Sequence, residues 1–369
     1  MIERFIVVAC LACTGCEALF HLDKLRLVVD GAPGSDGSTD APGEPNLAFV
    51  TSQKVVPASL GSVAAADAMC SSLAAAAGHP GHYVAWLSSS TSNATSRMGT
   101  TARGWVRADG RPFADTLVDI AQGRIWYPLR LTEAGDDVAS SGDPADLVVA
   151  TGTEASGAPS LGNTCSDYTN PSGGITTGLA DNAPYGWTSQ MGGGCSTAMR
   201  LYCFEIDHAT PVTLVPESSR QAFVLTTDVS GGATLASDDQ HCNTEAAGAG
   251  LPGTYRAALA TTTASALSRF TPGAPWVRAD GVTTIDSSGA MLAPVLFEAG
   301  GGFELTVAWS GAPSLTAKAP TAAASCGDWT LTNTTQGLTG NVSRSAGEAF
   351  GGIPNACSNS LRVYCLQDQ

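Results

Sequence analysis

Most of this chain consists of two similar segments in tandem, and that repetition constrains its fold more than any other feature of the sequence. The segment WVRADG stands intact at residues 105–110 and again at 276–281. Other matching pairs follow one order along the chain: AFV at 48–50 and 222–224, Asp-x-x-Cys at 67–70 and 239–242, Ser-Arg at 96–97 and 268–269, and Arg-x-Tyr-Cys at 200–203 and 362–365. Chance can supply one match but not an ordered series, so the sequence predicts a tandem duplication.

With 369 residues, the chain is long enough for two domains that each bury a core. We assign the first copy, repeat 1, to residues 47–207 and the second copy, repeat 2, to residues 221–369. A linker at 208–220 joins them. The formal charge of -15 at pH 7 repels polyphosphates, so nucleic acid is not an expected partner.

Local signals within repeat 1 alternate between strand and helix. Residues 48–52 have the alternation typical of a strand, and the Ala-rich residues 63–77 predict a helix that ends at Gly78. Further strands are expected at 83–87, 105–108 and 200–205, and a short second helix, reduced to a turn in repeat 2, at 113–122. The Gly/Thr/Ser-rich stretch 132–194 predicts few regular elements. This order predicts a mixed α+β domain with long loops.

Cysteine usage indicates an oxidising compartment. Of 11 cysteines, three lie in the first 16 residues, and the others divide four to each repeat: Cys70, Cys165, Cys195 and Cys203, then Cys242, Cys326, Cys357 and Cys365. An even number in each domain suits disulfide bonds, and the sequence alone permits three connectivities per domain. None of these eight forms a Cys-x-x-Cys pair, and no close His/Cys cluster joins them, so a zinc site is not expected.

The amino terminus has the pattern of an export signal. Arg4 supplies a positive charge, and the apolar residues 5–12 are too few to span a bilayer. The ending Thr14-Gly15-Cys16 resembles the lipobox of bacterial lipoproteins, although Cys13 stands where that pattern prefers Leu. The resemblance implies a signal peptide at 1–16, acylation of Cys16, and an outer-membrane anchor on the surface of a Gram-negative cell. An ordinary cleaved signal and a misassigned start codon remain alternatives. Residues 17–46, acidic and rich in Gly, Pro and Ser, predict a flexible tether.

The order of motifs in each repeat resembles endostatin, a C-type-lectin-like domain derived from collagen. The resemblance is carried by AFV, the helix with Asp-x-x-Cys, the run GHPGHYVAWLS at 78–88, a later Thr-Gly, Cys-x-x-aromatic and Tyr-Cys. It implies two tandem C-type-lectin-like domains, each a small mixed sheet with one or two helices, long loops and two nested disulfides. Pairing the first cysteine with the fourth and the second with the third implies the bonds Cys70–Cys203, Cys165–Cys195, Cys242–Cys365 and Cys326–Cys357. Bacterial surface lipoproteins of unassigned function contain similar domains.

The residues with which calcium-dependent lectins of that superfamily bind sugar are missing from the matching positions. The segments before Cys195 and Cys357 read SQMGGG and GGIPNA, without the carboxylates that calcium requires. Glu-Pro-Asn does occur at 44–46, but in the expected tether, so we interpret it as coincidence. Two further groups were considered as metal ligands and interpreted instead as a solvated loop and a surface turn: Glu133, Asp136, Asp137, Asp143 and Asp146, and His79 with His82. No metal and no cofactor is expected.

No catalytic arrangement is expected either. The sequence contains neither GxSxG nor HExxH, and only five histidines are available as bases. Trp105, Trp276, Arg107 and Arg278 recur in WVRADG, which favours core packing and an ion pair at a strand end.

Three aromatic residues in the long-loop half of repeat 1, Tyr168, Tyr185 and Trp187, are the candidates for a ligand surface. An aromatic ring there can stack on a sugar or anchor a protein partner. The sequence therefore favours a binding or adhesion module for an extracellular protein or glycan, independent of calcium and not an enzyme. The alternative is a structural envelope protein with no diffusible ligand.

Overall fold

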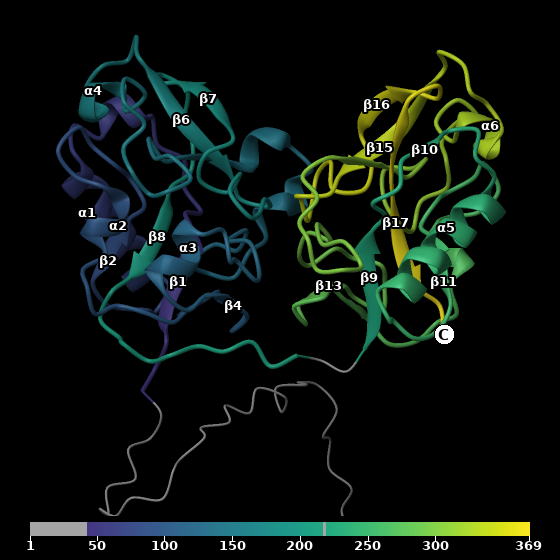
Figure 1. Ribbon diagram of the computed structural model, residues 1–369. Helices are drawn as coiled ribbons and strands as arrows, with labels where there is room; N and C mark the ends of the chain where they lie inside the picture. The colour runs from purple at the N-terminus through teal and green to yellow at the C-terminus, as the bar shows by residue number, and fades with distance from the viewer. Residues whose placement is uncertain (1–42, 217–218) are drawn as a thin grey trace, which may run out of the picture. The chain divides into compact units, whose positions relative to one another are not determined.

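Each repeat is organised by an opening strand and a closing strand that pair side by side. The computed structural model describes residues 43–216 and 219–369, so the predicted signal peptide, the predicted acylation site Cys16 and nearly all of the predicted tether lie outside the described residues. Residues 43–369 belong to one unit. In this unit the chain has the mixed α+β architecture that the sequence predicts, with several sheets (Figure 1).

The central sheet of repeat 1 has the strand order β2-β8-β1-β3-β4. Strand β1 runs antiparallel to β8 and parallel to β3. The strands are β1 (Asn46–Val50), β2 (Tyr83–Ala85), β3 (Trp105–Val106), β4 (Pro112–Ala114) and β8 (Tyr202–Glu205). Asn46, placed by its composition at the end of the tether, is fully buried in β1, where its side-chain amide donates to the carbonyls of Arg103 and His208.

Repeat 2 builds the same sheet in the same order, β11-β17-β9-β12-β13. Its strands are β9 (Arg220–Val224), β11 (Tyr255–Ala257), β12 (Trp276–Val277), β13 (Thr283–Ile285) and β17 (Ser360–Gln367), and β10 (Val229–Ser230) also pairs with β17. The duplication read from the sequence is therefore also a duplication of the strand pairing.

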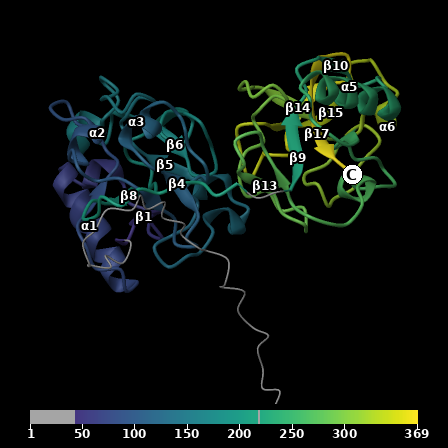
Figure 2. The same cartoon turned by 60° about the horizontal axis from the view of Figure 1, so that its bottom comes forward.

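A second sheet occupies the stretch for which few regular elements were predicted, and that prediction is wrong. Repeat 1 forms a separate sheet of β5 (Val148–Ala150), β6 (Gly174–Leu179) and β7 (Met191–Gly194). In repeat 2 the equivalent strands β14 (Val307–Trp309), β15 (Gln336–Asn341) and β16 (Ile353–Ala356) continue the central sheet, because β14 pairs with β17. Figure 2 shows β14 and β15 beside β17 and β9. The sequence did not indicate these strands because glycine is uncommon in strand interiors. Here glycine is required: a Cβ on Gly178 would lie 1.6 Å from the carbonyl oxygen of Trp187, so only glycine allows that close approach.

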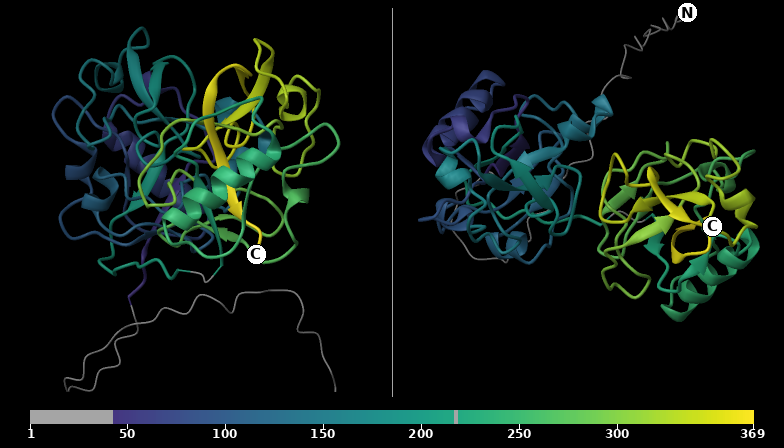
Figure 3. Two further views of the ribbon diagram at one scale, coloured as in Figure 1. Left: turned by 45° about the vertical axis from the view of Figure 1, so that its right-hand side comes forward. Right: turned by 90° about the horizontal axis from the view of Figure 1, so that it is seen from above.

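One long helix covers each central sheet. Helix α1 (Val63–Ala76) begins at the cap Ser62 and is followed by Gly78 at φ 89°, close to the predicted bounds. Its counterpart α5 (Leu235–Gly248) begins at Thr234 and lies across β17 in Figure 3 (left, green on yellow). The predicted helix 113–122 is shorter than expected, because Phe113 pairs within β4 and only α3 (Leu117–Ala121) is helical. Short turns of helix complete the fold: α2 (Ala94–Arg97), η1 (Pro57–Ser59), η2 (Val138–Ser141), η3 (Pro144–Asp146) and η4 (Leu267–Arg269).

The matching sequence segments meet in space. Asp67 accepts hydrogen bonds from Arg97 and from the amide of Ala85, and Asp239 does the same with Arg269 and Ala257. These contacts join the helix to the neighbouring strand in both repeats. Within WVRADG, Trp105 and Trp276 are buried, and Arg107 and Arg278 form ion pairs at the strand ends: Arg107 with Asp109 and Arg278 with Asp280. The predicted packing and ion-pair roles are confirmed.

The Cys-x-x-aromatic motifs form a turn with an unusual backbone. All four residues of α4 (Cys165–Tyr168) have φ between 49° and 68°, and α6 (Cys326–Trp329) repeats this with φ between 50° and 67°. Left-handed residues other than glycine cost about 1–2 kcal/mol each, so these turns must be held from outside. In repeat 1, Asp167 accepts from the amide and hydroxyl of Ser90, as Asp328 does from Thr262 in repeat 2.

Four disulfide bonds close the two repeats: Cys70–Cys203, Cys165–Cys195, Cys242–Cys365 and Cys326–Cys357. These are the pairs that the family resemblance implied. The outer bonds join α1 to β8 and α5 to β17, and the inner bonds hold the left-handed turns. All eight cysteines are fully buried.

Equivalent turns of the two repeats also bond to each other. The amide of Ala183 donates to the carbonyl of Ser343, and the amide of Ser345 donates to the carbonyl of Asp181. This reciprocity is typical of a two-fold contact. Arg344 forms an ion pair with the fully buried Asp181 at 3.0 Å. Burial raises the pKa of Asp181 above its ordinary value, and Arg344 opposes that rise.

The outer bond of repeat 1 is expected to stabilise the fold more than the inner bond. It closes a segment of 133 residues, whereas the inner bond closes 30. In the chain-entropy account, the longer closure stabilises by about 1 kcal/mol more. Urea unfolding of the double variant Cys70→Ala/Cys203→Ala should therefore show a larger loss than Cys165→Ala/Cys195→Ala. An equal or smaller loss would contradict this account and assign the larger share to the left-handed turn.

Asp238 is expected to make the protein less stable as the pH rises. This carboxyl is 1% exposed and its Oδ1 has no hydrogen-bond partner. Burial, with the neighbouring Asp239, raises its pKa to about 7. The folded chain thus keeps a proton that the unfolded chain has lost, and stability falls between about pH 4 and pH 7.

Repeat 1 has Ala66 at the position of Asp238, which makes Asp238→Ala a natural test. At pH 8 this variant should gain up to about 4 kcal/mol in free energy of unfolding, with little gain at pH 4. Asp239→Ala is the matched control, and it should destabilise at both pH values because it removes the contacts with Arg269. A less stable Asp238→Ala variant at pH 8 would show that the carboxylate is paired.

Candidate ligand-binding site

Two of the three candidate aromatic residues are buried, so the predicted aromatic surface is wrong for them. Tyr168 is fully buried, since its hydroxyl donates to the carbonyl of Ser88 at 2.6 Å and braces the left-handed turn. Trp187 is 1% exposed and packs at centre distances of 5.0 Å from Trp86 and 5.3 Å from Tyr202. Both side chains serve the core. Of the three candidates, Tyr185 alone reaches solvent, with 38% exposure.

Tyr185 joins two loops of repeat 1. It lies in the turn that follows β6, and its hydroxyl donates to the carbonyl of Gln122 at 3.3 Å. Its ring lies directly on Gly123, where a Cβ atom would come within 2.7 Å of the ring. Gly123 also has φ 70°, so two independent constraints require glycine there. The ring therefore fills the gap between the 122–125 loop and the 183–188 turn.

The corresponding gap in repeat 2 has no such ring. Gly347 replaces Tyr185, each standing ten residues before the third cysteine of its repeat. Gly289 corresponds to Gly123, because each lies five residues before the proline, Pro294 or Pro128, whose carbonyl accepts from the WVRADG arginine. With no aromatic side chain between them, these segments of repeat 2 form two walls of a hollow of about 350 Å³.

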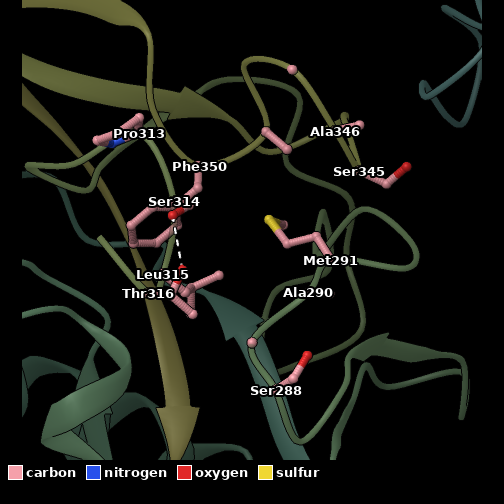
Figure 4. A pocket seen from close by; sticks show the side chains of 13 residues that line it. Ser288, Ala290, Met291, Pro313, Ser314, Leu315, Thr316, Ser345, Ala346 and Phe350 are labelled. Atoms are coloured by element: carbon pink, nitrogen blue, oxygen red, sulfur yellow. Dashed lines mark hydrogen bonds between the residues drawn. The ribbon is translucent and has the colours of Figure 1, made fainter. Parts of the chain in front are cut away.

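The hollow has an apolar interior and hydroxyl groups on its walls. Met291 points toward Phe350 and Leu315 across the open space (Figure 4). Phe350 and Leu315 are buried, and Phe350 stacks on Tyr364, whose hydroxyl donates to the carbonyl of Ala349 at 2.6 Å.

Four hydroxyl residues, Ser288, Ser314, Thr316 and Ser345, complete the walls, and the hydroxyl of Ser345 already donates to the carbonyl of Asp181. The hydroxyls of Ser314 and Thr316 lie 3.2 Å apart. Of the described residues that line the hollow, none carries a charge. A volume of this size lies at the lower end of the range for small-ligand pockets.

A second hollow of about 360 Å³ lies beside Tyr185 and has a more polar lining. Three amide side chains, Asn182, Gln190 and Asn341, contribute to it together with Leu305, which is 55% exposed. Amides beside an aromatic ring suit the hydroxyl groups of a sugar. The exposed candidate Tyr185 thus lines this second hollow, whereas the first hollow lies in repeat 2 at the position equivalent to its own.

Four of the five acidic residues considered as metal ligands have other partners, and the fifth, Asp136, is exposed. Glu133 accepts from the amide of Ser52 at 3.0 Å, Asp137 pairs with Arg130, and Asp143 caps a short helical turn. Asp146 pairs with Lys54 and Arg200, and its hydrogen bond with Lys54 lowers its pKa to about 2.

These four carboxylates therefore accept hydrogen bonds, form ion pairs or cap a turn, whereas the sequence predicted a solvated loop. His82 is exposed and lies 2.8 Å from Asp207. Within residues 43–216 and 219–369, no group of three or more His, Cys, Asp or Glu side chains could hold a metal ion. Among the helices of these described residues, none is long and apolar enough to cross a membrane.

No protein-family model matches the chain, and no curated protein matches it significantly. The two repeats are therefore the best reference for each other. No single sequence motif points to Met291, Leu315 or Phe350 as lining residues of a hollow. The available signal was a difference between matched positions, Tyr185 against Gly347 and Trp187 against Ala349.

Proposed function

We propose that this chain is an exported, lipid-anchored surface protein that binds an extracellular protein or glycan without calcium. We further propose that its repeats are C-type-lectin-like domains of the endostatin type. The nested disulfides, the repeated α+β order and the long loops support that assignment. It is not an enzyme in this proposal.

One observation carries the proposal: the same pair of loops is closed by Tyr185 in repeat 1 and open in repeat 2. A protein with a purely structural role has no need for an open, partly apolar hollow in one copy only, because filling it would stabilise the fold. Apolar surface around a few hydroxyl groups is typical of a ligand site.

Binding is expected to persist without calcium and to depend on the hollow of repeat 2. Arrays of glycans and matrix proteins would be probed with the full oxidised chain, once with calcium and once with chelator. Ser314→Trp should fill the hollow and weaken binding at least roughly tenfold, which corresponds to about 1.4 kcal/mol. Ser172→Trp, on an exposed loop of repeat 1, is the control and should bind like the original chain.

The outcomes separate the alternatives. Binding that requires calcium would overturn the metal-independent site. Binding that Ser314→Trp leaves unchanged would move the site away from this hollow. If the chain binds nothing on either array, the structural envelope role gains the support that the binding role loses.

The lipid anchor has its own test. Cells that express the chain should incorporate labelled palmitate into it, because the ending Thr14-Gly15-Cys16 resembles a lipobox. Cys16→Ala should abolish the label, whereas Cys13→Ala, three residues earlier, should retain it. Equal labelling of the Cys16→Ala variant would exclude acylation at that position.

A further inference from the structure

We infer that the hollow of repeat 2 receives a phenol ring, the side chain of a tyrosine on a partner protein. This inference rests on the proposed binding function and names the ligand chemistry. Its first support is internal to the chain. Repeat 1 places a tyrosine of its own between the equivalent loops, with the hydroxyl on a loop carbonyl and the ring on glycine.

The open position in repeat 2 retains the features that hold that ring. Gly289 keeps the loop free of a side chain at the position of Gly123, although Leu267 and Thr316 lie close to it, at 2.9 and 3.2 Å from a Cβ built there. Ser288 stands at the position of Gln122, the residue whose carbonyl accepts the tyrosine hydroxyl, and Ser288 lines the hollow. By this correspondence, the carbonyl of Ser288 is the expected acceptor for the hydroxyl of a ring that enters beside Gly347.

The chemistry of the walls selects an aromatic ring over a sugar. Met291 supplies a polarisable sulfur and Phe350 an aromatic face, and both interact favourably with aromatic rings. A sugar ring needs several donors and acceptors, but the described residues that line this hollow include no carboxylate, amide or guanidinium side chain. The hydroxyls of Ser288, Ser314 and Thr316 suffice for one phenolic hydroxyl.

The test uses p-cresol, which is the tyrosine side chain alone. Titration of the full chain with 13C-labelled methionine methyl groups reports on Met291 directly. One p-cresol should bind, with a Kd on the order of 1 mM for a ligand of this size, and should shift the Met291 signal. Toluene, which lacks the hydroxyl, should bind at least several-fold more weakly, and methyl glucoside should leave Met291 unshifted.

Variants identify the site. Met291→Ala should remove the shifted signal and weaken p-cresol binding, while Met191→Ala, an equal change at an exposed methionine of repeat 1, should do neither. Tyr185→Ala should open the equivalent space in repeat 1 and raise the number of bound p-cresol molecules from one to two.

The inference is overturned if p-cresol leaves Met291 unshifted at 20 times the expected Kd, about 20 mM, if toluene binds equally well, or if methyl glucoside binds in its place. It is also overturned if Tyr185→Ala adds no second site. Any of these results would leave the proposed binding function intact, provided that the glycan or matrix-protein arrays identify a ligand. Arrays without a ligand, together with p-cresol binding, would instead show a phenol site whose partner was absent from the arrays.

Discussion

The bond between the long helix and the closing strand is the constraint on which each repeat depends. Cys70 is joined to Cys203 and Cys242 to Cys365, so the helix near the start of the repeat is fixed to the strand at its end. The residues between the two bonded cysteines of each repeat must therefore fold as one long segment whose ends are held together. The short strands and loops of that segment supply much of the buried core, such as Trp86, Trp105 and Trp187 in repeat 1. The covalent closure restricts the unfolded chain and so favours this folded arrangement.

The inner disulfide and the left-handed turn hold the later part of that long segment in each repeat. Four consecutive residues with positive φ are costly, yet both repeats keep them. Asp167 and Tyr168 bind the loop at Ser88–Ser90, and Asp328 and Trp329 bind the equivalent loop at 260–262. The strain therefore has a structural use: it brings a carboxylate and an aromatic donor to one loop from adjacent positions.

Against this constant framework, the two repeats differ where a ligand could enter. The turn after β6 carries Tyr185 and Trp187 in repeat 1, and the turn after β15 carries Gly347 and Ala349 in repeat 2. Phe350 takes over the packing on the tyrosine of the closing strand, as Trp187 does in repeat 1. Divergence at this turn leaves the core intact in both copies and opens a hollow in one. Duplication thus permits a change in surface chemistry without a change in fold.

The sequence by itself determined the duplication, the α+β class, the long helices and the buried role of WVRADG. These follow from local patterns and from the order of matching segments, which do not depend on distant contacts. Only the tertiary structure decided the rest. The second sheet escaped prediction because its glycines, such as Gly178, exist for a backbone contact nine residues away along the chain. Exposure of Tyr185 and burial of Tyr168 were equally invisible, since an aromatic residue in a loop has the same composition signal whether its hydroxyl faces water or a buried carbonyl. The hollow is formed by loops that are far apart in the sequence, so no single segment predicts it.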